Sequence, residues 1–274
     1  MMQAKVNELV ELLKATKRTQ AVNGKPQDQV PSCLIFHDEE MGMWTTSLVK
    51  DGKTSVSTFR RDATSSGEGT VAVADIDRLL GILSMHGPTV KIESHDGKIV
   101  VKSSGKQTTL SGGGSSMAFP HSDESIVEWA TKSGEVSKSI NAEEGKYLMR
   151  DGAVLESIWK GRVSANDLFE AFRCDNINSQ KLNLYTIEFE HDGLVVSVGE
   201  EIKGRTKTDL ECEKKPYCEG KAVMAQFSGG LDHVVSHLFG TIELSLIDFT
   251  EYNQVYGLII TDGDSWVWQR SVLS

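Results

Sequence analysis

The chain has 274 residues, 39% of them hydrophobic and only five of them proline, so it is long enough for two domains with separate cores and too apolar to be disordered. It contains no apolar run of the ~18 residues that a membrane helix needs, and its N-terminus lacks a signal-peptide pattern, so we expect a cytoplasmic protein with no membrane segment. The formal net charge of −10 excludes a surface coated with DNA-binding patches, but it permits a basic strip on one face.

The predicted elements begin with a helix over residues 1–19, which a Gly- and Pro-containing stretch at residues 24–31 ends. Its expected buried stripe follows helical spacing and consists of Val6, Leu9, Val10 and Leu13. Residues 32–61 then alternate between apolar and polar side chains, which is typical of an antiparallel meander. In this meander we expect Leu34 and Phe36 to pair with residues 44–49.

A second helix is predicted where an apolar strand at residues 71–73 runs into a stretch that ends at residues 86–88. Its stripe is Ile76, Leu79, Leu80 and Leu83. Three short strands are expected to follow, at residues 89–93, 98–102 and 107–110. This half of the chain therefore combines two helices with a mostly antiparallel sheet.

Residues 111–116 are Gly- and Ser-rich and predict a flexible connector. A phosphate-binding loop is disfavoured because no Lys-Ser or Lys-Thr pair follows the glycines. Residues 122–161 carry the weakest pattern, with apolar residues that could begin a second sheet. We expect one domain over residues 1–110, a connector over 111–135 and a second domain over 136–274.

The second half repeats the plan of the first. Ser164 is expected to cap a third helix at residues 165–172, and a fourth helix is expected at residues 231–238. The expected strands of this half are residues 182–189, 194–198, 206–212, 222–227, 241–247, 254–261 and 265–272.

The helices themselves are repeated. Residues 165–172 match residues 6–13 class for class at an offset of 159, and residues 231–238 share the apolar pattern of residues 76–83 at an offset of 155. Order and separation are nearly preserved, which indicates a duplicated fold. We predict an α+β chain of two tandem domains, each an antiparallel sheet backed by two helices.

The strand and helix at residues 71–85 resemble the second helix of DNA polymerase sliding clamps, most closely those of tailed phages. Residues 96–101, 164–172 and 204–209 fit the corresponding places of that family, whose plan proliferating cell nuclear antigen shares. The resemblance implies a non-catalytic processivity factor that forms a homotrimeric ring around duplex DNA. It also implies a replicative DNA polymerase and an ATP-dependent clamp loader as partners and, for a viral protein, the host cytoplasm as its location.

The resemblance also implies two surfaces. Cations on the helices would line the pore, and our candidates are Lys14, Lys17, Arg18, Arg78, Arg173, Lys181 and His233. Taken singly, each of these helix faces is also explained as an ordinary solvated face. Peptides of partner proteins would dock beside the connector, in an apolar pocket for which we name Met117, Phe119, Pro120, Val272 and Leu273. These residues could equally cover the local core.

Two other classes of protein, an enzyme and a β-rich structural protein, are alternatives for this sequence. An enzyme is disfavoured because the acidic clusters at residues 38–40 and 262–264 lie at turn signals without a catalytic or calcium-binding spacing. The four cysteines are scattered, so we expect free thiols, no metal and no cofactor. A β-rich viral structural or scaffold protein that assembles through its sheet edges is the alternative, although it does not require duplicated helices.

Overall fold

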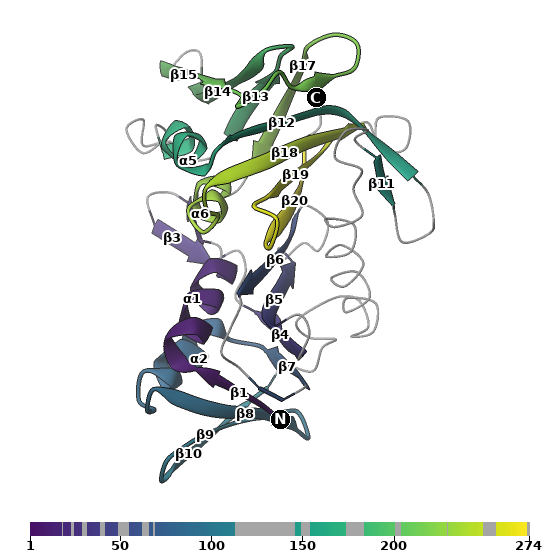
Figure 1. Ribbon diagram of the computed structural model, residues 1–274. Helices are drawn as coiled ribbons and strands as arrows, with labels where there is room; N and C mark the ends of the chain where they lie inside the picture. Colours follow the sequence, from purple (N-terminus) through teal and green to yellow (C-terminus); the bar gives the residue numbers. More distant parts are fainter. Residues whose placement is uncertain are drawn as a thin grey trace. The chain divides into compact units, whose positions relative to one another are not determined.

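The computed structural model describes residues 1–17, 19–22, 25–28, 32–38, 42–48, 55–61, 66–67, 69–112, 146–148, 154–173, 184–200, 204–228, 230–248 and 256–272. The chain divides into two compact units (Figure 1). Unit 1 comprises Met1–Arg18, Asp28–Gly52 and Val56–Ala130, and unit 2 comprises Thr19–Gln27, Lys53–Ser55 and Thr131–Ser274. The expected connector, residues 111–135, lies outside the described residues except for Ser111 and Gly112.

Unit 1 places two helices among antiparallel strands. Its elements are β1 (Met2–Lys5), α1 (Val6–Thr16), β4 (Cys33–Asp38), β5 (Gly42–Leu48), β6 (Ser55–Arg61), β7 (Gly69–Val73), α2 (Ile76–Leu83), β8 (Thr89–His95), β9 (Lys98–Ser103) and β10 (Lys106–Ser111). The strands follow the orders β6-β5-β4-β7 and β1-β8-β9-β10. Two short strands follow α1 in the sequence but belong almost entirely to unit 2: β2 (Thr19–Val22) and β3 (Lys25–Asp28), which pair with each other.

Unit 2 has a longer list of strands and again two helices. Its elements are β11 (Lys146–Leu148), β12 (Val154–Ser164), α5 (Ala165–Arg173), β13 (Leu184–Phe189), β14 (Gly193–Glu200), β15 (Gly204–Glu211), β16 (Tyr217–Cys218), β17 (Val223–Ser228), α6 (Leu231–Val235), β18 (Thr241–Asp248), β19 (Tyr256–Thr261) and β20 (Trp266–Arg270). The strands follow the orders β15-β14-β13-β17 and β11-β12-β18-β19-β20, with β16 also paired to β12.

The two units have the same internal connectivity. The order β6-β5-β4-β7 in unit 1 corresponds to β15-β14-β13-β17 in unit 2, and β1-β8-β9-β10 corresponds to β12-β18-β19-β20. In each unit a helix follows the first strand of the second set, and another helix follows the fourth strand of the first set. The predicted duplication and the α+β class are therefore confirmed.

The start of the chain differs from the expectation. Residues 2–5 form β1 rather than the first turn of a helix, because Met2 and Ala4 alternate into the core and pair with Ile92 and Val90 of β8. Helix α1 therefore begins at Val6 and ends at Thr16. Its most deeply buried side chains are Leu9, Leu12, Leu13, Ala15 and Thr16, so the expected stripe is rotated by about one position.

The other helices and hairpins lie close to their predicted places. Asp75 caps α2, because its side chain accepts a hydrogen bond from the backbone N–H of Arg78 at 2.9 Å. Ser164 caps α5 as predicted, by accepting from the N–H of Asp167 at 3.3 Å. Helix α6 ends at Val235, before the expected end at Leu238, although Leu238 is still buried.

The long strand β12 occupies the region that the sequence left unassigned. Its Trp159 is buried and donates a hydrogen bond through Nε1 to the carbonyl oxygen of Glu190 at 2.8 Å. The indole also packs edge-to-face with Phe189, with 5.2 Å between the ring centroids. Gly161 lies against this indole: a Cβ there would be 2.5 Å from Trp159 Cη2 and 2.9 Å from Cys212 Sγ. Unit 2 thus packs its core around a tryptophan that leaves no room for a side chain at position 161.

In the part of the chain that the structure describes, no helix is long and apolar enough to cross a membrane.

Candidate nucleic-acid interface and sheet edges

An ion pair joins the two helices of unit 1. Lys17 follows α1, and its Nζ lies 2.7 Å from both carboxylate oxygens of Asp77 on α2. Asp77 is more than half exposed, so the pair contributes at most about 1 kcal/mol to stability. One of the expected pore cations therefore has a structural partner on the neighbouring helix.

Two further candidate cations are exposed on the same helix pair. Lys14 lies in the last turn of α1, and Arg78 lies in the first turn of α2. Capping by Asp75 uses the backbone N–H of Arg78, which leaves its guanidinium group available for other contacts. Arg18 lies outside the described residues. The first helix pair thus presents positive charge on an exposed surface.

The second helix pair carries its positive charge differently. Arg173, at the end of α5, is 52% exposed, lies 3.3 Å from Glu170 Oε1 and stands over the Phe169 ring at 5.4 Å. On the α6 side, the rings of His233 and His237 are 4.8 Å apart. Lys181 lies outside the described residues. That these residues face DNA stays a prediction.

The C-terminal end of the described chain runs along the outer edge of β17. Ser271 forms a β-bridge with Phe227, and the N–H of Val272 donates to the carbonyl oxygen of Gln226 at 2.7 Å. Val272 is 38% exposed. The other expected members of the partner pocket, Met117, Phe119, Pro120 and Leu273, lie outside the described residues. The pocket itself therefore stays a prediction.

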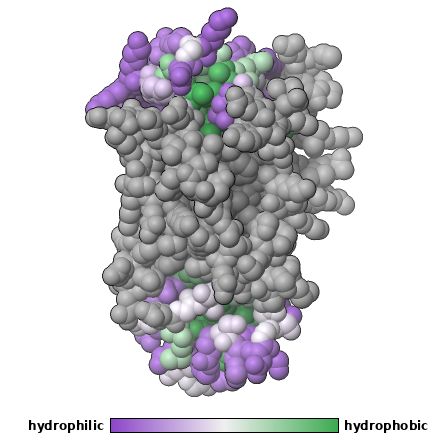
Figure 2. All heavy atoms as spheres, turned by 90° about the vertical axis from the view of Figure 1, so that its right-hand side faces the viewer, coloured by the Kyte–Doolittle hydropathy of each residue, from purple (hydrophilic) through white to green (hydrophobic). Residues whose placement is uncertain are grey.

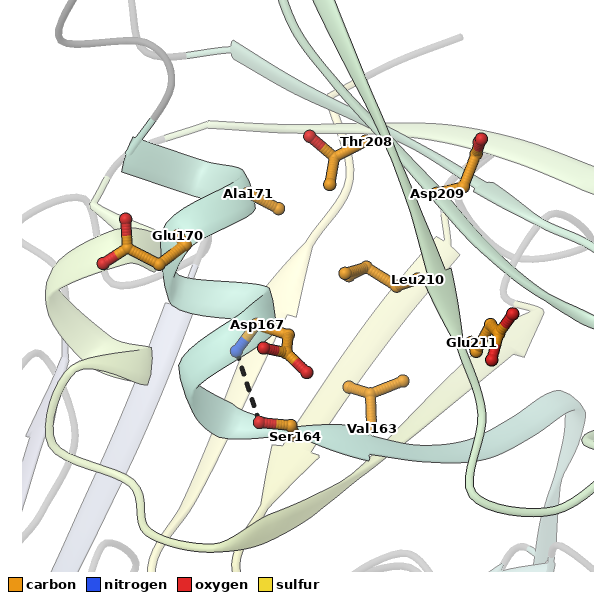
Figure 3. A pocket seen from close by; sticks show the side chains of 9 residues that line it. All are labelled: Val163, Ser164, Asp167, Glu170, Ala171, Thr208, Asp209, Leu210 and Glu211. Carbon is orange, nitrogen blue, oxygen red and sulfur yellow. Dashed lines mark hydrogen bonds between the residues drawn. The ribbon is translucent and has the colours of Figure 1, made fainter.

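A groove that the sequence did not predict lies between α5 and β15 in unit 2 (Figure 3). Its volume is about 430 Å³, and its walls are Val163, Ser164, Asp167, Glu170, Ala171, Thr208, Asp209, Leu210 and Glu211. Ala171 and Leu210 point toward one another across it, and Asp167 stands at one end beside its cap, Ser164. The sequence predicted a strand at residues 206–212, although Leu210 is the only large apolar side chain of β15, and only the packing of α5 beside this strand creates the groove.

In unit 1, the turn after α2 is fixed to the edge strand β10. The Nδ1 and Nε2 atoms of His86 lie 2.8 and 3.0 Å from the hydroxyl oxygens of Ser103 and Thr108. Lys106 Nζ donates to the carbonyl oxygen of Met85 at 2.8 Å. Desolvation, together with the nearby positive charge of Lys106, lowers the pKa of His86 from its ordinary value of 6.5. The lowered pKa favours the neutral form of the imidazole.

The described residues do not offer a metal site or an activated nucleophile. No group of three or more His, Cys, Asp or Glu side chains among them could hold a metal ion. Burial raises the pKa of the Cys33, Cys212 and Cys218 thiols, which keeps them protonated and poorly nucleophilic. Asp262 accepts from the N–H groups of Asp264 and Ser265, so this acidic cluster forms the turn that was expected.

No protein-family model and no curated protein matches the sequence. Solved structures do match. DNA polymerase III subunit beta from Borrelia burgdorferi superimposes with a TM-score of 0.62 at 11% identity, over 99% of this chain and 64% of that one. The H. pylori beta clamp superimposes with a TM-score of 0.63 at 13% identity, over 99% of this chain and 64% of the clamp chain. PCNA of A. fulgidus, solved with the C-terminal region of FEN-1 bound, superimposes with a TM-score of 0.58 at 14% identity. The match covers 100% of this chain and 98% of the PCNA chain.

The chain therefore spans about two thirds of the length of the bacterial proteins and nearly the whole length of the archaeal one. At these identities the likeness establishes a shared fold.

Proposed function

We propose that this chain, which has the fold of the DNA polymerase sliding clamps, is itself a sliding clamp. It encircles duplex DNA, tethers a replicative DNA polymerase and carries out no chemistry of its own. The observation that carries the proposal is the repeated strand order, with one pair of packed helices in each unit. A ring holds DNA topologically, so its lining needs only weak, sequence-independent contacts with phosphates.

The ring is proposed to be a homotrimer. The near-complete coverage of the A. fulgidus PCNA chain, against about two thirds of the bacterial chains, supports a subunit of two domains. Among the described residues, β10 and β15 each end a sheet with no strand on the outer side. The outer sides of β1 and β17, by contrast, are bridged by Ser66 and Ser271. Joining β10 of one copy to β15 of the next is a head-to-tail contact, and such contacts form a ring when the rotation from copy to copy closes.

Contact with DNA is assigned to the helix pairs. Lys14 and Arg78 on the first pair and Arg173 and His233 on the second are the described candidates. Their neighbours include Asp77 and several other acids, which keeps the attraction to phosphate weak. Weak attraction suits a protein that must slide, because tight ion pairs with the backbone would hold it in place.

Partner proteins are proposed to bind through short peptides. A segment of FEN-1 is bound to A. fulgidus PCNA, which supports peptide docking on this fold. We assign the corresponding pocket to Met117, Phe119, Pro120, Val272 and Leu273. Assembly on closed DNA requires that a ring be opened, so an ATP-dependent clamp loader is the further partner.

Retention on DNA of different topology tests the proposed function. The protein is loaded onto nicked circular DNA and onto the same DNA after linearisation, with its oligomeric mass followed by light scattering. We expect a mass of three chains and retention on circles but loss from linear ends. A monomer that binds both DNAs equally would contradict the clamp, and growth into large DNA-independent assemblies would support the scaffold protein instead.

A further inference from the structure

An exposed methionine lies beside β10, the strand that ends a sheet of unit 1 among the described residues. Hydrophilic side chains cover most of the described surface in Figure 2, with smaller hydrophobic areas between them. Met85 is nevertheless 55% exposed, although hydrogen bonds from Lys106 to its carbonyl oxygen and around the adjacent His86 hold its backbone against β10. The backbone here is therefore already ordered, and only the rotamers of the methionine side chain remain to be restricted when a partner covers it.

The groove of unit 2 offers the complementary shape at the other free edge. Ala171 and Leu210 form an apolar floor beside β15, where Figure 3 shows them facing one another. The volume of about 430 Å³ leaves room for an unbranched side chain such as methionine. An exposed apolar side chain and a groove with an apolar floor and acidic walls therefore lie next to the two sheet edges that the proposed ring would join. The acidic residues of the walls are Asp167, Glu170, Asp209 and Glu211.

The strand directions bring these two features together. The described strands of both units pair antiparallel. If β10 adds to β15 of the next copy in the same way, the beginning of β10, at Lys106, meets the end of β15, at Leu210. If the helices of both copies then lie on the same face of the joined sheet, the turn after α2 of one copy reaches the groove between α5 and β15 of the next.

We propose that Met85 of one copy fills the groove between α5 and β15 of the next, with Lys106 of the first copy facing Asp167 of the second. This inference rests on the ring of the proposed function and names the side chains that close it. Charge supports the assignment, because Asp167 is exposed at one end of the groove and Lys106 is exposed beside Met85. These opposite charges favour pairing of β10 with β15. Pairing of β10 with β10 would bring two Lys106 side chains together, and pairing of β15 with β15 would bring two Asp167 side chains together.

Substitution of the methionine tests the contact. Met85→Asp removes the apolar contact and adds a carboxylate to a groove that four acidic residues already line, so we expect the subunit concentration at which the trimer dissociates to rise about tenfold or more. Met224→Asp is the matched control, because Met224 is 59% exposed on β17, away from the groove. Analytical ultracentrifugation measures both variants, and circular dichroism verifies that each is folded. Equal dissociation of Met85→Asp and the wild type would overturn the proposal.

A charge exchange tests the rim. Asp167→Lys and Lys106→Glu are each expected to weaken the trimer, and the double variant is expected to recover most of the loss because the pair is restored in reverse. Additive losses in the double variant would contradict a direct pairing of these two residues.

Covalent trapping gives a readout that does not depend on weakened assembly. The double variant Met85→Cys, Thr208→Cys should form covalent dimers and trimers under mild oxidation, whereas each single variant should stay at the wild-type background. If the wild type is a trimer that is retained on circular DNA and the double variant gives no such cross-link, the proposed contact is wrong but the ring is not. A wild-type monomer indifferent to DNA topology would remove the ring as well.

Discussion

A single histidine shows how local contacts set a charge state in this protein. Both ring nitrogens of His86 have hydroxyl partners, on Ser103 and Thr108, and the cationic Lys106 stands nearby. Desolvation and that positive charge lower the pKa of His86 below 6.5, so the unfolded chain binds the proton more readily than the folded one. This residue therefore favours folding above its ordinary pKa, and its contribution is lost as the pH falls from about 6.5 toward the lowered pKa.

The substitution His86→Gln should make stability less sensitive to acid. Glutamine keeps a donor and an acceptor but has no proton to gain, so the linkage to pH is removed. Between about pH 7.5 and pH 5, the thermal midpoint of the wild type should fall further than that of the variant. Differential scanning calorimetry at matched ionic strength measures both slopes. Parallel slopes would show that other groups cause the acid sensitivity.

At the scale of single elements, α2 depends on its cap. Asp75 satisfies the N–H of Arg78, one of the unpaired donors at the start of the helix, and its charge favours the positive end of the helix dipole. The substitution Asp75→Ala should lower the free energy of unfolding by about 1 kcal/mol and the melting temperature by a few degrees. Asp75→Asn keeps an acceptor and should recover most of the loss. An unchanged melting temperature in the alanine variant would contradict the role of the cap.

The sequence predicted elements best where a periodic pattern and a local signal coincided. Helix α2 combines an apolar stripe with a stop signal at residues 86–88, and the β13–β14 hairpin has a turn signal at residues 191–193, so both elements were predicted. Strand β1 was missed because Met2 and Ala4 alternate for only four residues before a helical stripe takes over. Burial of those residues depends on β8, which is distant in the sequence. Short strands that take their partner from elsewhere carry little pattern of their own.

The candidate site was predictable only in part, for the same reason. Lys14, Arg78 and Arg173 could be placed on helix surfaces because the helices were recognised. The ion pair between Lys17 and Asp77 joins two helices that are 60 positions apart in the sequence, and no local signal announces it. The groove beside β15 likewise exists only once α5 has packed, so the sequence did not predict that Ala171 and Leu210 would form its floor.

At the scale of the whole molecule, charge on the helices should govern loading onto DNA. Arg78 and Arg173 are both exposed, so Arg78→Glu with Arg173→Glu should weaken loading at low salt without unfolding the subunit. The difference from the wild type should shrink as salt is added, because counterions screen the lost contacts. Fluorescence anisotropy on nicked circles and circular dichroism measure the two effects.

The control for that experiment is a reversal with the same change in net charge. Lys91 and Lys98 lie exposed on β8 and β9, and Lys91 alternates with the buried Val90 and Ile92, so its side chain points away from the core. Lys91→Glu with Lys98→Glu should leave loading near the wild-type level. An equal loss of DNA loading in both double variants would indicate an effect of net charge and would contradict the assignment of DNA contact to the helices.

The partner pocket makes a separate prediction. Phe119→Asp should abolish stimulation of the polymerase, because a carboxylate in an apolar docking pocket cannot be desolvated cheaply. The mass of the ring and its retention on circular DNA should stay unchanged. A primer-extension assay that measures product length gives the readout. Full stimulation by the variant would place the docking surface elsewhere.

The packing around Gly161 has a consequence for how this chain can vary. Any side chain there would collide with the indole of Trp159, which is buried and hydrogen-bonded to Glu190 and so cannot swing aside, and with the sulfur of Cys212. In a saturation library screened for folded protein, glycine should be the only residue recovered at this position. A larger residue at position 161 should be recovered only when a smaller residue replaces Trp159, so the two positions should covary.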